Sequence, residues 1–501
     1  MCRFTIGELA RIVGAKAKET EGLFAGVSID SRTIREGDCF FAIAGENFDG
    51  HAYVAEAFSK GATCAVVERD ATEQPQEATA RFEVDDRPVL KVRNTVKALG
   101  DFAREHRRQS SFKVVAITGS VGKTTTRQMV YHVLSQHYSV FQAPRNFNNA
   151  IGLPLALLGA DPRDQIVVVE LASNHPGEIG YLTRIARPDI AVVTNVYPVH
   201  LEGFGNLQTI VREKLSIADG LTGGGVLLIN GDLDLLVGAC RARASEFTTF
   251  GKSINCNFRV RDLSDDGFSS SFTIDDTRVY LPVPGLGNVE NALAAWAVCS
   301  QFGLSIREFA QAVETLAPVA MRAEPLQIGT LTVLNDCYNA NPASMKNALE
   351  MLRNLQSALD PGRNRRTVFI CGDMAELGEQ AEQLHAELGE SVAGAGVQML
   401  LAAGKFAQVT TEAAEKAASH NLQTARFQNT SSARSRLHEF VKDGDIILVK
   451  GSRTGKLETV TEKLRELFTR AGNECTVRVL RRPRHESRAS KIRASTNKHR
   501  D

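Results

Sequence analysis

The segment VVAITGSVGKTTTRQMV, residues 114–130, carries the side chains and glycines that a phosphate-binding loop needs. An apolar run predicts a strand, Gly119 and Gly122 flank a turn, and the following run predicts a helix. Backbone N–H groups at such a helix start bind anions. Lys123 has the reach for the β- and γ-phosphates of a nucleotide, and the hydroxyl of Thr124 is able to hold Mg²⁺. An ordinary turn that happens to carry a lysine would not need all these features in register, so the segment predicts a nucleoside triphosphate site.

This loop is shorter than the common G-x-x-x-x-G-K-[ST] pattern, because Ile117, inside the strand, occupies the position of the outer glycine. By itself the loop indicates a bound nucleotide and leaves the reaction open. The residues expected to contact the nucleotide here are Gly119, Ser120, Val121, Gly122, Lys123, Thr124 and Thr125.

Two side chains at strand ends are candidates for holding a metal ion. Glu170 ends the apolar run QIVVVEL, and the carboxyl edge of a parallel sheet is where open α/β folds bind ligands. A glutamate at a strand end is commonly a solvated residue, but a phosphate loop on the same sheet favours Mg²⁺ ligation. His200 follows the run IAVVTNV in the same edge layer, and its alternative is a structural histidine.

The elements that must position these residues alternate between strand and helix over most of the chain. At 501 residues the chain is too long for one core and suggests about three domains, which we place at residues 1–86, 87–321 and 322–471. Continuously apolar strands separated by helices predict parallel sheets covered on both faces. The expected fold class is α/β, with a small N-terminal domain, a central P-loop ATPase domain with a mainly parallel sheet, and a C-terminal Rossmann-like domain.

Two regions depart from this alternation. Residues 248–284 alternate polar and apolar side chains between Asp-Gly and Asp-Asp turns, which predicts an antiparallel extension of the central sheet. Residues 472–501 are basic, rich in serine and poor in apolar residues, which predicts a disordered tail. Contact of this tail with an anionic partner is the alternative.

Composition and charge exclude several classes of protein. The 59 Lys and Arg residues balance 58 Asp and Glu residues, so no overall field favours nucleic acid or a membrane surface. Nine cysteines without a C-x-x-C pair fit reduced thiols better than a disulfide framework. The start MCRFTIGELARIVGA predicts an amphipathic helix, with Ile6, Leu9, Ile12 and Val13 on one face, and not a signal peptide. No apolar run is long enough to span a bilayer. We expect a soluble, cytoplasmic, monomeric protein.

The chain resembles the Mur ligases, the ATP-dependent ligases that build the peptide stem of peptidoglycan and to which folylpolyglutamate synthases are related. The phosphate loop of that family has the same G-x-x-G-K-T form, without the outer glycine. The resemblance runs in order from Met1 to about Leu467. Its further motifs are RNFNNAIGLP, VVVELASNHPGEI, VYPVHLEGFG, VREKLSIADGL, PGLGNVENALAAWAVC, MRAEPL, DCYNANPASM and VKGSR.

Within the family, YNANP together with GDMAELG most resembles the members that join D-alanyl-D-alanine to UDP-N-acetylmuramoyl-tripeptide. The D-N-P-R motif that is usual in tripeptide-forming members is not found in this sequence. The resemblance implies ATP and Mg²⁺ as cofactors, an acyl-phosphate intermediate, and a role in peptidoglycan synthesis and hence in cell shape and division. Another amide ligase of the family, including a folylpolyglutamate synthase, is one alternative. A non-catalytic ATP-binding scaffold is the other, although a scaffold has no need for a second metal site.

The resemblance also implies which residues of the central domain act on the nucleotide and the metal ions. In the family, the lysine matching Lys214 is carbamylated and holds a second Mg²⁺, and desolvation favours the neutral amine that carbamylation requires. Ser216 stands where the family usually has a glutamate after this lysine. The alternative for Lys214 is a solvent-facing position on a helix predicted over residues 207–221. The implied metal ligands are Thr124, Glu170, His200 and Lys214, and the implied catalytic residues are Lys123, His200, Lys214 and Arg322.

Further positions follow from the family motifs. Asn291 would face adenine. It lies in a helix expected to start near Asn288, and the alternative for Asn288 is a role as the cap of that helix. Arg322 would reach the ATP phosphates from the domain junction, and Asp336 would contact the ribose or the hinge.

The substrates have their own implied residues in the first and third domains. Arginine and serine beside backbone amides suit a pyrophosphate, and His51 has a second interpretation as a cap at a helix start. The implied substrate residues are Ser31, Arg32, Asp49 and His51 for the UDP-sugar, Asn339, Asn341, Lys450 and Arg453 for the amine, and Asn148 at the central domain.

Overall fold

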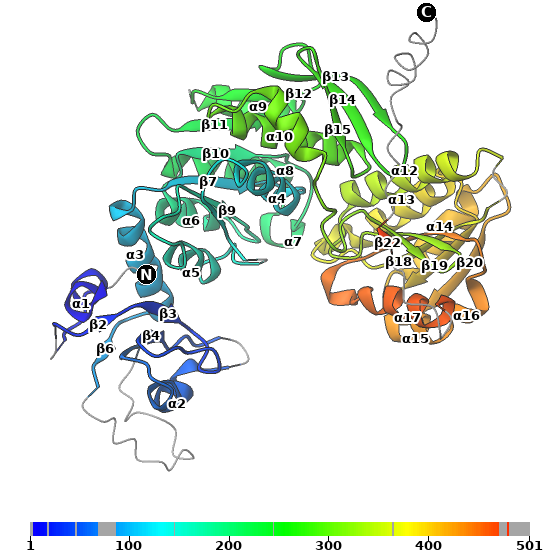
Figure 1. Ribbon diagram of the computed structural model, residues 1–501. Helices are drawn as coiled ribbons and strands as arrows, with labels where there is room; N and C mark the ends of the chain where they lie inside the picture. The colour runs from blue at the N-terminus through cyan, green and yellow to red at the C-terminus, as the bar shows by residue number, and fades with distance from the viewer. Residues whose placement is uncertain are drawn as a thin grey trace, which may run out of the picture.

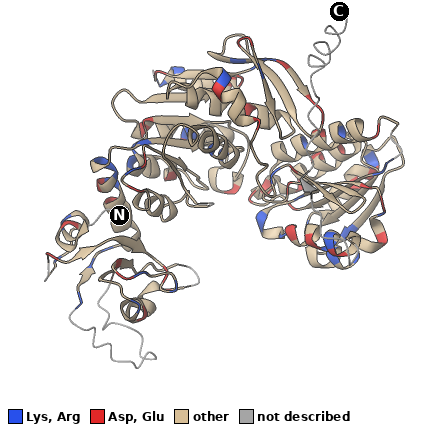
Figure 2. Ribbon diagram, in the orientation of Figure 1, with Lys and Arg blue, Asp and Glu red and all other residues tan. Residues whose placement is uncertain are grey.

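The computed structural model describes residues 4–17, 20–45, 48–68, 87–144, 146–243, 245–362, 365–469 and 478–479. These residues form an N-terminal, a central and a C-terminal unit, each built around its own sheet (Figure 1). None of the helices in the described ranges is both long and apolar enough to cross a membrane. Lys and Arg are interspersed with Asp and Glu over all three units (Figure 2), and the seven described cysteines carry free thiols.

The N-terminal unit is a four-stranded parallel sheet with the order β3-β4-β5-β6. Its first helix begins at Ile6 because Thr5 and Glu8 form a capping box, and it ends where Gly14 takes a left-handed conformation. Ile6 and Leu9, on the predicted apolar face, are buried. The elements are β1 (Phe4–Thr5), α1 (Ile6–Val13), β2 (Leu23–Phe24), β3 (Gly26–Ser28), β4 (Asp38–Phe41), η1 (Gly50–Tyr53), α2 (Val54–Ser59), β5 (Cys64–Val67) and β6 (Val89–Lys91).

The predicted boundary after residue 86 cuts through this unit, because β6 pairs with β5 in its sheet. The next helix, α3 (Thr95–Gln109), is shared between two cores: Leu99 and Phe102 pack in the N-terminal cluster, and Ala103 packs in the central one. Near its end, Arg107 donates to the backbone oxygen of Ala186 at 3.1 Å. The N-terminal sheet therefore extends past the predicted boundary, and α3 fastens it to the central unit.

The central unit contains a nine-stranded sheet in the order β15-β14-β13-β12-β11-β10-β7-β9-β8. Pairing is parallel from β13 to β8 and antiparallel among β13, β14 and β15. The predicted antiparallel extension is thus confirmed for its last three strands, whereas β12 continues the parallel part. The strands are β7 (Lys113–Thr118), β8 (Val140–Gln142), β9 (Ile166–Glu170), β10 (Ile190–Val193), β11 (Val226–Asn230), β12 (Thr248–Gly251), β13 (Phe258–Asp265), β14 (Ser270–Ile274) and β15 (Thr277–Leu281).

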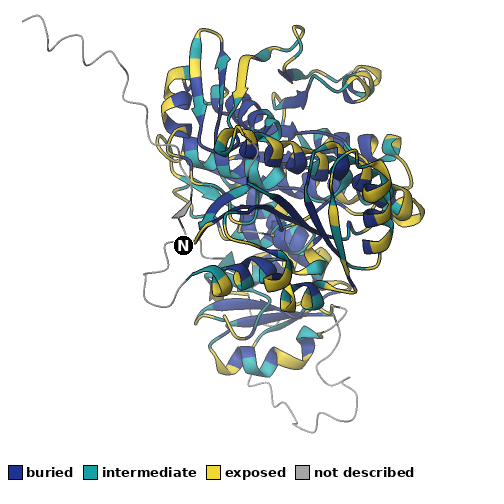
Figure 3. Ribbon diagram, turned by 90° about the vertical axis from the view of Figure 1, so that its right-hand side faces the viewer, coloured by how far each residue is buried: buried dark blue, intermediate teal, exposed yellow. Residues whose placement is uncertain are grey.

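Helices cover both faces of this sheet, as expected for a parallel α/β fold. Along β7, Val115 and Ile117 enter one apolar cluster, and Val114 and Ala116 enter the other. The strands are accordingly among the most buried parts of the molecule (Figure 3). The helices are α4 (Lys123–Leu134), α5 (Gly152–Leu158), α6 (Glu178–Ala186), α7 (Leu201–Phe204), α8 (Leu207–Leu215), η2 (Ser216–Gly220), α9 (Asp234–Ala242), α10 (Leu286–Ser300) and α11 (Ile306–Val313).

The C-terminal unit has a seven-stranded sheet in the order β20-β19-β18-β21-β17-β16-β22, parallel from β20 to β17. The three-domain α/β fold class is confirmed. The strands are β16 (Glu324–Ile328), β17 (Leu331–Asn335), β18 (Thr367–Gly372), β19 (Met399–Ala403), β20 (Gln423–Phe427), β21 (Ile446–Lys450) and β22 (Arg478–Val479), and the helices are α12 (Pro342–Leu359), η3 (Gly378–Gln380), α13 (Ala381–Gly394), α14 (Ala407–Ala417), α15 (Thr430–Ser435), α16 (Leu437–Phe440), η4 (Arg453–Gly455) and α17 (Glu458–Phe468).

The predicted disordered tail lies outside the described residues except at β22. Arg478 and Val479 pair antiparallel with Gln327 and Leu326 of β16. At these two residues the expectation of disorder does not hold, because backbone pairing at a strand edge needs no apolar side chain.

A hairpin of the central unit packs onto the C-terminal unit. Its turn, between β13 and β14, places Phe268 against the apolar cluster of the C-terminal unit. Gly267, with φ +79°, comes so close that a Cβ atom there would lie 2.4 Å from the Cα of Leu355 in α12. Gly267 and Phe268 therefore form a direct contact between the two units.

Candidate active site

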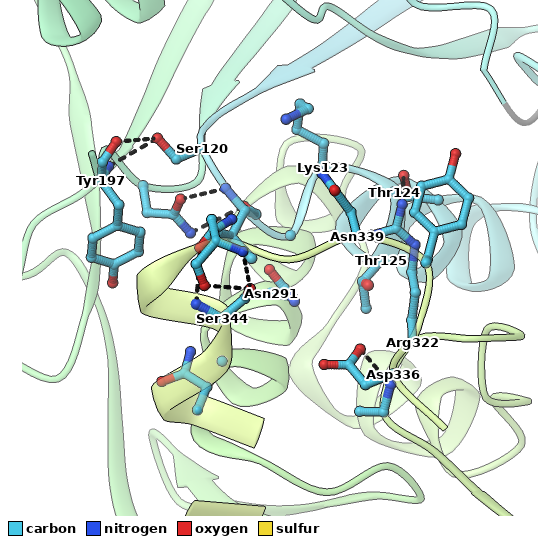
Figure 4. Close-up of a pocket in the computed structure, with 18 of the residues that line it drawn as sticks. Ser120, Lys123, Thr124, Thr125, Tyr197, Asn291, Arg322, Asp336, Asn339 and Ser344 are labelled. Carbon is cyan, nitrogen blue, oxygen red and sulfur yellow. Dashed lines mark hydrogen bonds between the residues drawn. The ribbon is translucent and has the colours of Figure 1, made fainter. Parts of the chain in front are cut away.

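A cavity of about 290 Å³ lies between the central and C-terminal units (Figure 4). Residues from both units line it, so neither unit forms it alone. Of the residues predicted from the sequence, those that line it are Ser120, Val121, Gly122, Lys123, Thr124, Thr125, Asn148, Glu170, His200, Asn291, Arg322, Asp336, Asn339, Asn341 and Lys450.

The predicted phosphate loop joins β7 to α4 and needs both of its glycines. Gly122 has φ +87°, and a Cβ atom there would lie 2.1 Å from Oδ1 of Asn291. Gly119 has φ +148°, and a Cβ atom there would lie 2.0 Å from Oγ1 of Thr194. The first turn of α4 follows at once, and its N–H groups have no partners within the helix. The segment thus has the form of an anion-binding helix start.

The loop is held from the neighbouring strand by residues that the sequence did not indicate. After β10, Asn195 accepts the N–H of Val121 at 2.8 Å, and Thr194 donates to the oxygen of Val121 at 2.7 Å. The hydroxyl of Ser120 donates to the oxygen of Tyr197 at 3.0 Å. The short polar run TNVY after an apolar strand was the available signal, but it does not reveal what it touches.

Lys123 is enclosed beside the loop. Its Nζ donates to the oxygen of Gly119 at 2.7 Å. Burial lowers the pKa of Lys123 to about 8, the nearby carboxylate of Glu170 opposes that shift, and Arg322 adds to it. An anionic phosphate bound beside Lys123 would favour its charged ammonium form and would pair with it.

Glu170, at the end of β9, is buried and connects the loop to two arginines. Its carboxylate accepts from the hydroxyl of Thr124 at 3.1 Å and pairs with Nε of Arg127 at 2.7 Å. Arg322 donates from Nη2 to the same Thr124 hydroxyl at 3.0 Å. Arg127 was missed, because an arginine four residues into a helix has no distinctive sequence pattern. It supplies the charge partner that a buried carboxylate requires.

The residues present fit a magnesium ion, which the family resemblance implies. The Thr124 hydroxyl and the Glu170 carboxylate are adjacent oxygen donors at the helix start. Among the described residues, no group of at least three His, Cys, Asp or Glu side chains is placed to hold a metal ion. Mg²⁺ suits such a sparse site, because it keeps several waters and completes its shell with substrate phosphates.

His200 lies at the rim of the same cavity and meets the C-terminal unit. It precedes α7 with a left-handed backbone, φ +51°, and its Nδ1 bonds to the carboxylate of Glu376. This hydrogen bond and the proximity of its ring lower the pKa of Glu376. His200 is therefore a cavity residue with a partner that sequence reasoning missed, and its role as a metal ligand stays a prediction.

Lys214 is buried, so its alternative as a solvent-facing lysine is wrong. Only 1% of the residue is exposed, and its Nζ donates to the hydroxyl of Ser173 at 2.9 Å. Burial lowers its pKa to about 7, and the nearby charge of Lys123 contributes to that shift. It does not line the cavity itself. The predicted helix over 207–221 is α-helical to Leu215 and then a 3₁₀ turn.

The linker into the C-terminal unit places Arg322 at the centre of the cavity. Met321 and Ala323, on either side, have φ +60° and +48°. Asp336 accepts the N–H of Ala323, next to Arg322 in the linker, at 3.0 Å, and its expected role at the ribose or the hinge stays a prediction. The guanidinium of Arg322 lies 4.2 Å from the ring centroid of Tyr338, a cavity residue that the sequence did not indicate.

The predicted amine-site residues are only partly free to bind a substrate. Lys450 pairs with the carboxylate of Asp336 at 2.6 Å, so its positive charge already has a partner within the chain. Asn341 caps α12 by accepting the N–H of Ser344 at 2.9 Å. Asn339 lines the cavity, whereas Arg453 lies outside it and pairs with Glu458.

Helix α10 starts at Leu286, two residues before the predicted start, with Gly285 as its cap. Asn288 therefore does not cap it and instead donates from Nδ2 to the oxygen of Pro284 at 2.6 Å. Asn291 faces the loop, where its Oδ1 accepts from Thr126 at 3.2 Å, and its expected contact with adenine stays a prediction.

The predicted UDP-site residues lie in the N-terminal unit, and none of them lines this cavity. Ser31 is buried and donates to Glu56 at 3.1 Å, while Arg32 is exposed and pairs with Asp30. His51 is also buried: its Nδ1 bonds to Asp49 at 2.6 Å and its Nε2 accepts the N–H of Glu68 at 2.9 Å. Asp49, not His51, caps the helix start.

Comparisons with known proteins agree with this geometry. Three family models match the chain: "Mur ligase family, catalytic domain" at residues 23–107, "Mur ligase middle domain" at 117–299 and "Mur ligase, glutamate ligase domain" at 321–453. The UDP-N-acetylmuramoyl-tripeptide--D-alanyl-D-alanine ligase of Bacillus subtilis is 31% identical, with 92% of this chain and 97% of the relative covered. The ligase of the same name from Escherichia coli is 32% identical, with 93% and 99% covered.

Solved structures show the same likeness over the whole length. MurF from Acinetobacter baumannii matches with a TM-score of 0.82 at 29% identity, covering 93% of this chain and 99% of the neighbour. A MurF ligase from Thermotoga maritima in complex with ADP matches with a TM-score of 0.74 at 28% identity, covering 88% and 97%.

Proposed function

Because the chain belongs to the Mur ligase family, we propose that it joins D-alanyl-D-alanine to UDP-N-acetylmuramoyl-tripeptide with ATP, in the synthesis of the peptidoglycan precursor. The observation that carries the proposal is the cavity itself. Lys123 and Thr124 of the phosphate loop share one cavity with Asn339 of the C-terminal unit. An ATP-dependent ligase needs a phosphate site and an amine site within one reaction distance of each other.

The proposed reaction proceeds in two steps. The terminal carboxylate of the tripeptide attacks the γ-phosphorus of ATP, so that an acyl phosphate forms and ADP leaves. The amine of D-alanyl-D-alanine then attacks the acyl carbon, the amide bond forms, and phosphate and a proton are released. Both steps develop charge on phosphate oxygens, which cations within a cavity stabilise.

The chain provides those cations at two points of the cavity. Lys123 would exchange its bond to the Gly119 oxygen for the β- and γ-phosphates, whose negative charge would oppose the burial that lowers its pKa. Arg322 would approach the same phosphates from the linker, held by the ring of Tyr338. Bound Mg²⁺ would supply charge neutralisation of the phosphates, with Thr124 and Glu170 as its protein donors and His200 at the cavity rim.

Lys214 is proposed to become carbamylated and so to act as a further anionic metal ligand. Its burial and a pKa lowered to about 7 make the neutral amine accessible near neutral pH, and the neutral amine is the form that takes up CO₂. Its hydrogen bond to Ser173 fixes the Nζ end.

Substrate roles follow the division into units. We propose that the N-terminal unit binds the UDP-sugar through Ser31 and the exposed Arg32, and that Asn291 meets adenine beside the loop. Asp49 and His51 are proposed to shape that N-terminal site through their mutual hydrogen bond.

We propose that the amine binds to the C-terminal residues Asn339, Asn341, Lys450 and Arg453. Asn148 is proposed to contact the acceptor peptide. The enzyme is proposed to be a monomer and to act in the cytoplasm, where its substrate ATP is found.

A phosphate-release assay tests the proposal. With UDP-N-acetylmuramoyl-tripeptide, ATP and D-alanyl-D-alanine we expect turnover and a pentapeptide product by mass spectrometry, and omission of any one component should stop both. Lys123→Ala serves as the inactive variant. Its matched control is Lys113→Ala, at the exposed start of β7, the strand that leads into the loop. Better turnover with diaminopimelate, lysine, glutamate or a folate substrate would assign the chain to another ligase of the family.

A further inference from the structure

The GDMAELG segment, residues 372–378, has no role in the reaction proposed above, yet it contacts the central unit. It follows β18, and its Glu376 meets the segment before α7. Besides the bond between its carboxylate and Nδ1 of His200, the backbone oxygen of Glu376 accepts the N–H of Glu202 at 3.4 Å. A side-chain bond and a backbone bond therefore join the same residue to both sides of the α7 start.

The backbone is unusual on both sides of this contact. His200 has φ +51° and Glu376 has φ +61°, a left-handed conformation that costs free energy in residues other than glycine. Such conformations persist only where the surroundings enforce them. The two residues are thus held in orientations that the chain alone would disfavour, and those orientations bring their side chains together.

The rest of the segment is anchored within the C-terminal unit. Met374 and Leu377 are buried in its apolar cluster, and the N–H of Met374 donates to His385 at 3.0 Å. Asp373 accepts the N–H of Lys405 at 2.8 Å. From this anchored segment, Glu376 forms hydrogen bonds to the neighbouring unit, and Gly378 also approaches Glu202.

The chemistry of the pair determines the state of the histidine ring. An ionised carboxylate only accepts hydrogen bonds, so Nδ1 must carry a proton. In a neutral ring, Nε2 is then the lone-pair nitrogen. Carboxylates that orient a histidine in this way are common behind metal- and phosphate-binding histidines.

We propose that Glu376 is a positioning residue, which holds the His200 ring with Nδ1 protonated and Nε2 available to the cavity when the C-terminal unit sits on the central unit. His200 of the central unit therefore gains its hydrogen-bond partner only when the C-terminal unit contacts the central unit. The consequence for turnover rests on the proposed function, whereas the state of the ring is a property of the protein without substrate.

The state of the ring is measured directly by nitrogen NMR of the full chain with ¹⁵N-labelled histidine, at about pH 8, with His200→Gln to assign the signal. We expect the neutral Nδ1–H tautomer in the wild type and a mixture of tautomers in Glu376→Ala. Glu379→Ala, at an exposed position three residues on, is the matched control and should keep the wild-type signal. An Nε2–H or doubly protonated ring in the wild type would overturn the proposal.

A double-mutant cycle tests whether Glu376 acts through His200. Glu376→Ala should lower kcat about 10–100-fold, the usual effect of removing a partner of this kind, with the KM for the UDP-substrate unchanged. In a His200→Gln background the same change should cost less than about twofold. Equal losses in both backgrounds would mean that Glu376 does not work through the ring. If the wild type lacks ligase activity, the proposed function fails while the NMR result still decides the positioning role.

Discussion

Nη2 of Arg322 lies 3.0 Å from the hydroxyl of Thr124, although 198 positions separate the two residues in the chain. Thr124 opens the helix behind the phosphate loop, and Arg322 belongs to the linker between two units. The same arginine stacks on Tyr338 of the C-terminal unit. One guanidinium therefore connects the nucleotide site to the unit proposed to bind the amine, which makes the linker part of the site.

Replacing this guanidinium tests that connection. Arg322→Lys keeps the charge but loses the planar group that stacks on Tyr338 and reaches Thr124, so it is not a conservative change. We expect kcat/KM for ATP to fall about 10–100-fold, or about 1.4–2.7 kcal/mol of transition-state stabilisation. Arg307→Lys, at an exposed position of α11, is the control and should be neutral. Unchanged kinetics in Arg322→Lys would show that charge alone suffices.

Lys123→Ala should abolish ATP turnover while the UDP-substrate still binds. The lysine is enclosed by the loop of the central unit, whereas the residues proposed for the UDP-sugar lie in the N-terminal unit. Isothermal titration with the UDP-substrate and with ADP separates the two sites. Loss of UDP-substrate binding in the variant would contradict the division of labour between the units.

Lys214→Arg should remove most activity without preventing ATP binding, because a guanidinium stays charged and cannot take up CO₂. Lys214→Ala should be partly rescued by a short carboxylic acid that enters the vacated position. Wild-type activity should fall in degassed buffer and return with bicarbonate. Full activity in Lys214→Arg, together with no response of the wild type to bicarbonate, would exclude a carbamate.

Phe268→Ala should loosen the contact between the central hairpin and the C-terminal unit. The ring packs against the apolar cluster of that unit, beside the close approach of Gly267 to α12. We expect small-angle scattering to show a wider spread of interdomain arrangements, and turnover to fall several-fold because the cavity is shared. Ile254→Ala, at an exposed position of the central unit, is the control. Identical scattering and turnover in Phe268→Ala would mean that other contacts hold the units together.

The stability of the protein should fall below about pH 6.5 partly because of His106. Burial lowers the pKa of this histidine, whose ring lies among Phe4 and Phe112. The unfolded chain therefore binds the proton more readily than the native state, so the free energy of unfolding decreases as the pH falls through this range. His106→Phe should reduce this loss between about pH 8 and 5, as measured by denaturant unfolding. His137→Gln, at an exposed position, should follow the wild type, and an unchanged pH dependence in His106→Phe would refute the assignment.

Much of the fold was predictable because its causes are local. The continuously apolar runs around Val115 and Val168 predict strands that are covered on both faces, and both residues are buried. Capping residues such as Thr5 set where helices begin. The strand β6 was assigned to the wrong side of a boundary, because its membership depends on its pairing with β5, which no local pattern records. Short edge strands such as β8 were missed, since so few residues show no clear period.

The sequence by itself determined the phosphate loop, because Gly119, Gly122, Lys123 and Thr124 stand together between a predicted strand and a predicted helix. It also determined the family, through motifs that stand in order along the chain. Tertiary structure alone decided that Lys214 is buried, that Arg127 neutralises Glu170, and that Glu376 meets His200. Those relationships join residues of different elements, and the energy of a buried charge or a hydrogen bond depends on the partner that folding brings to it, which no local pattern records.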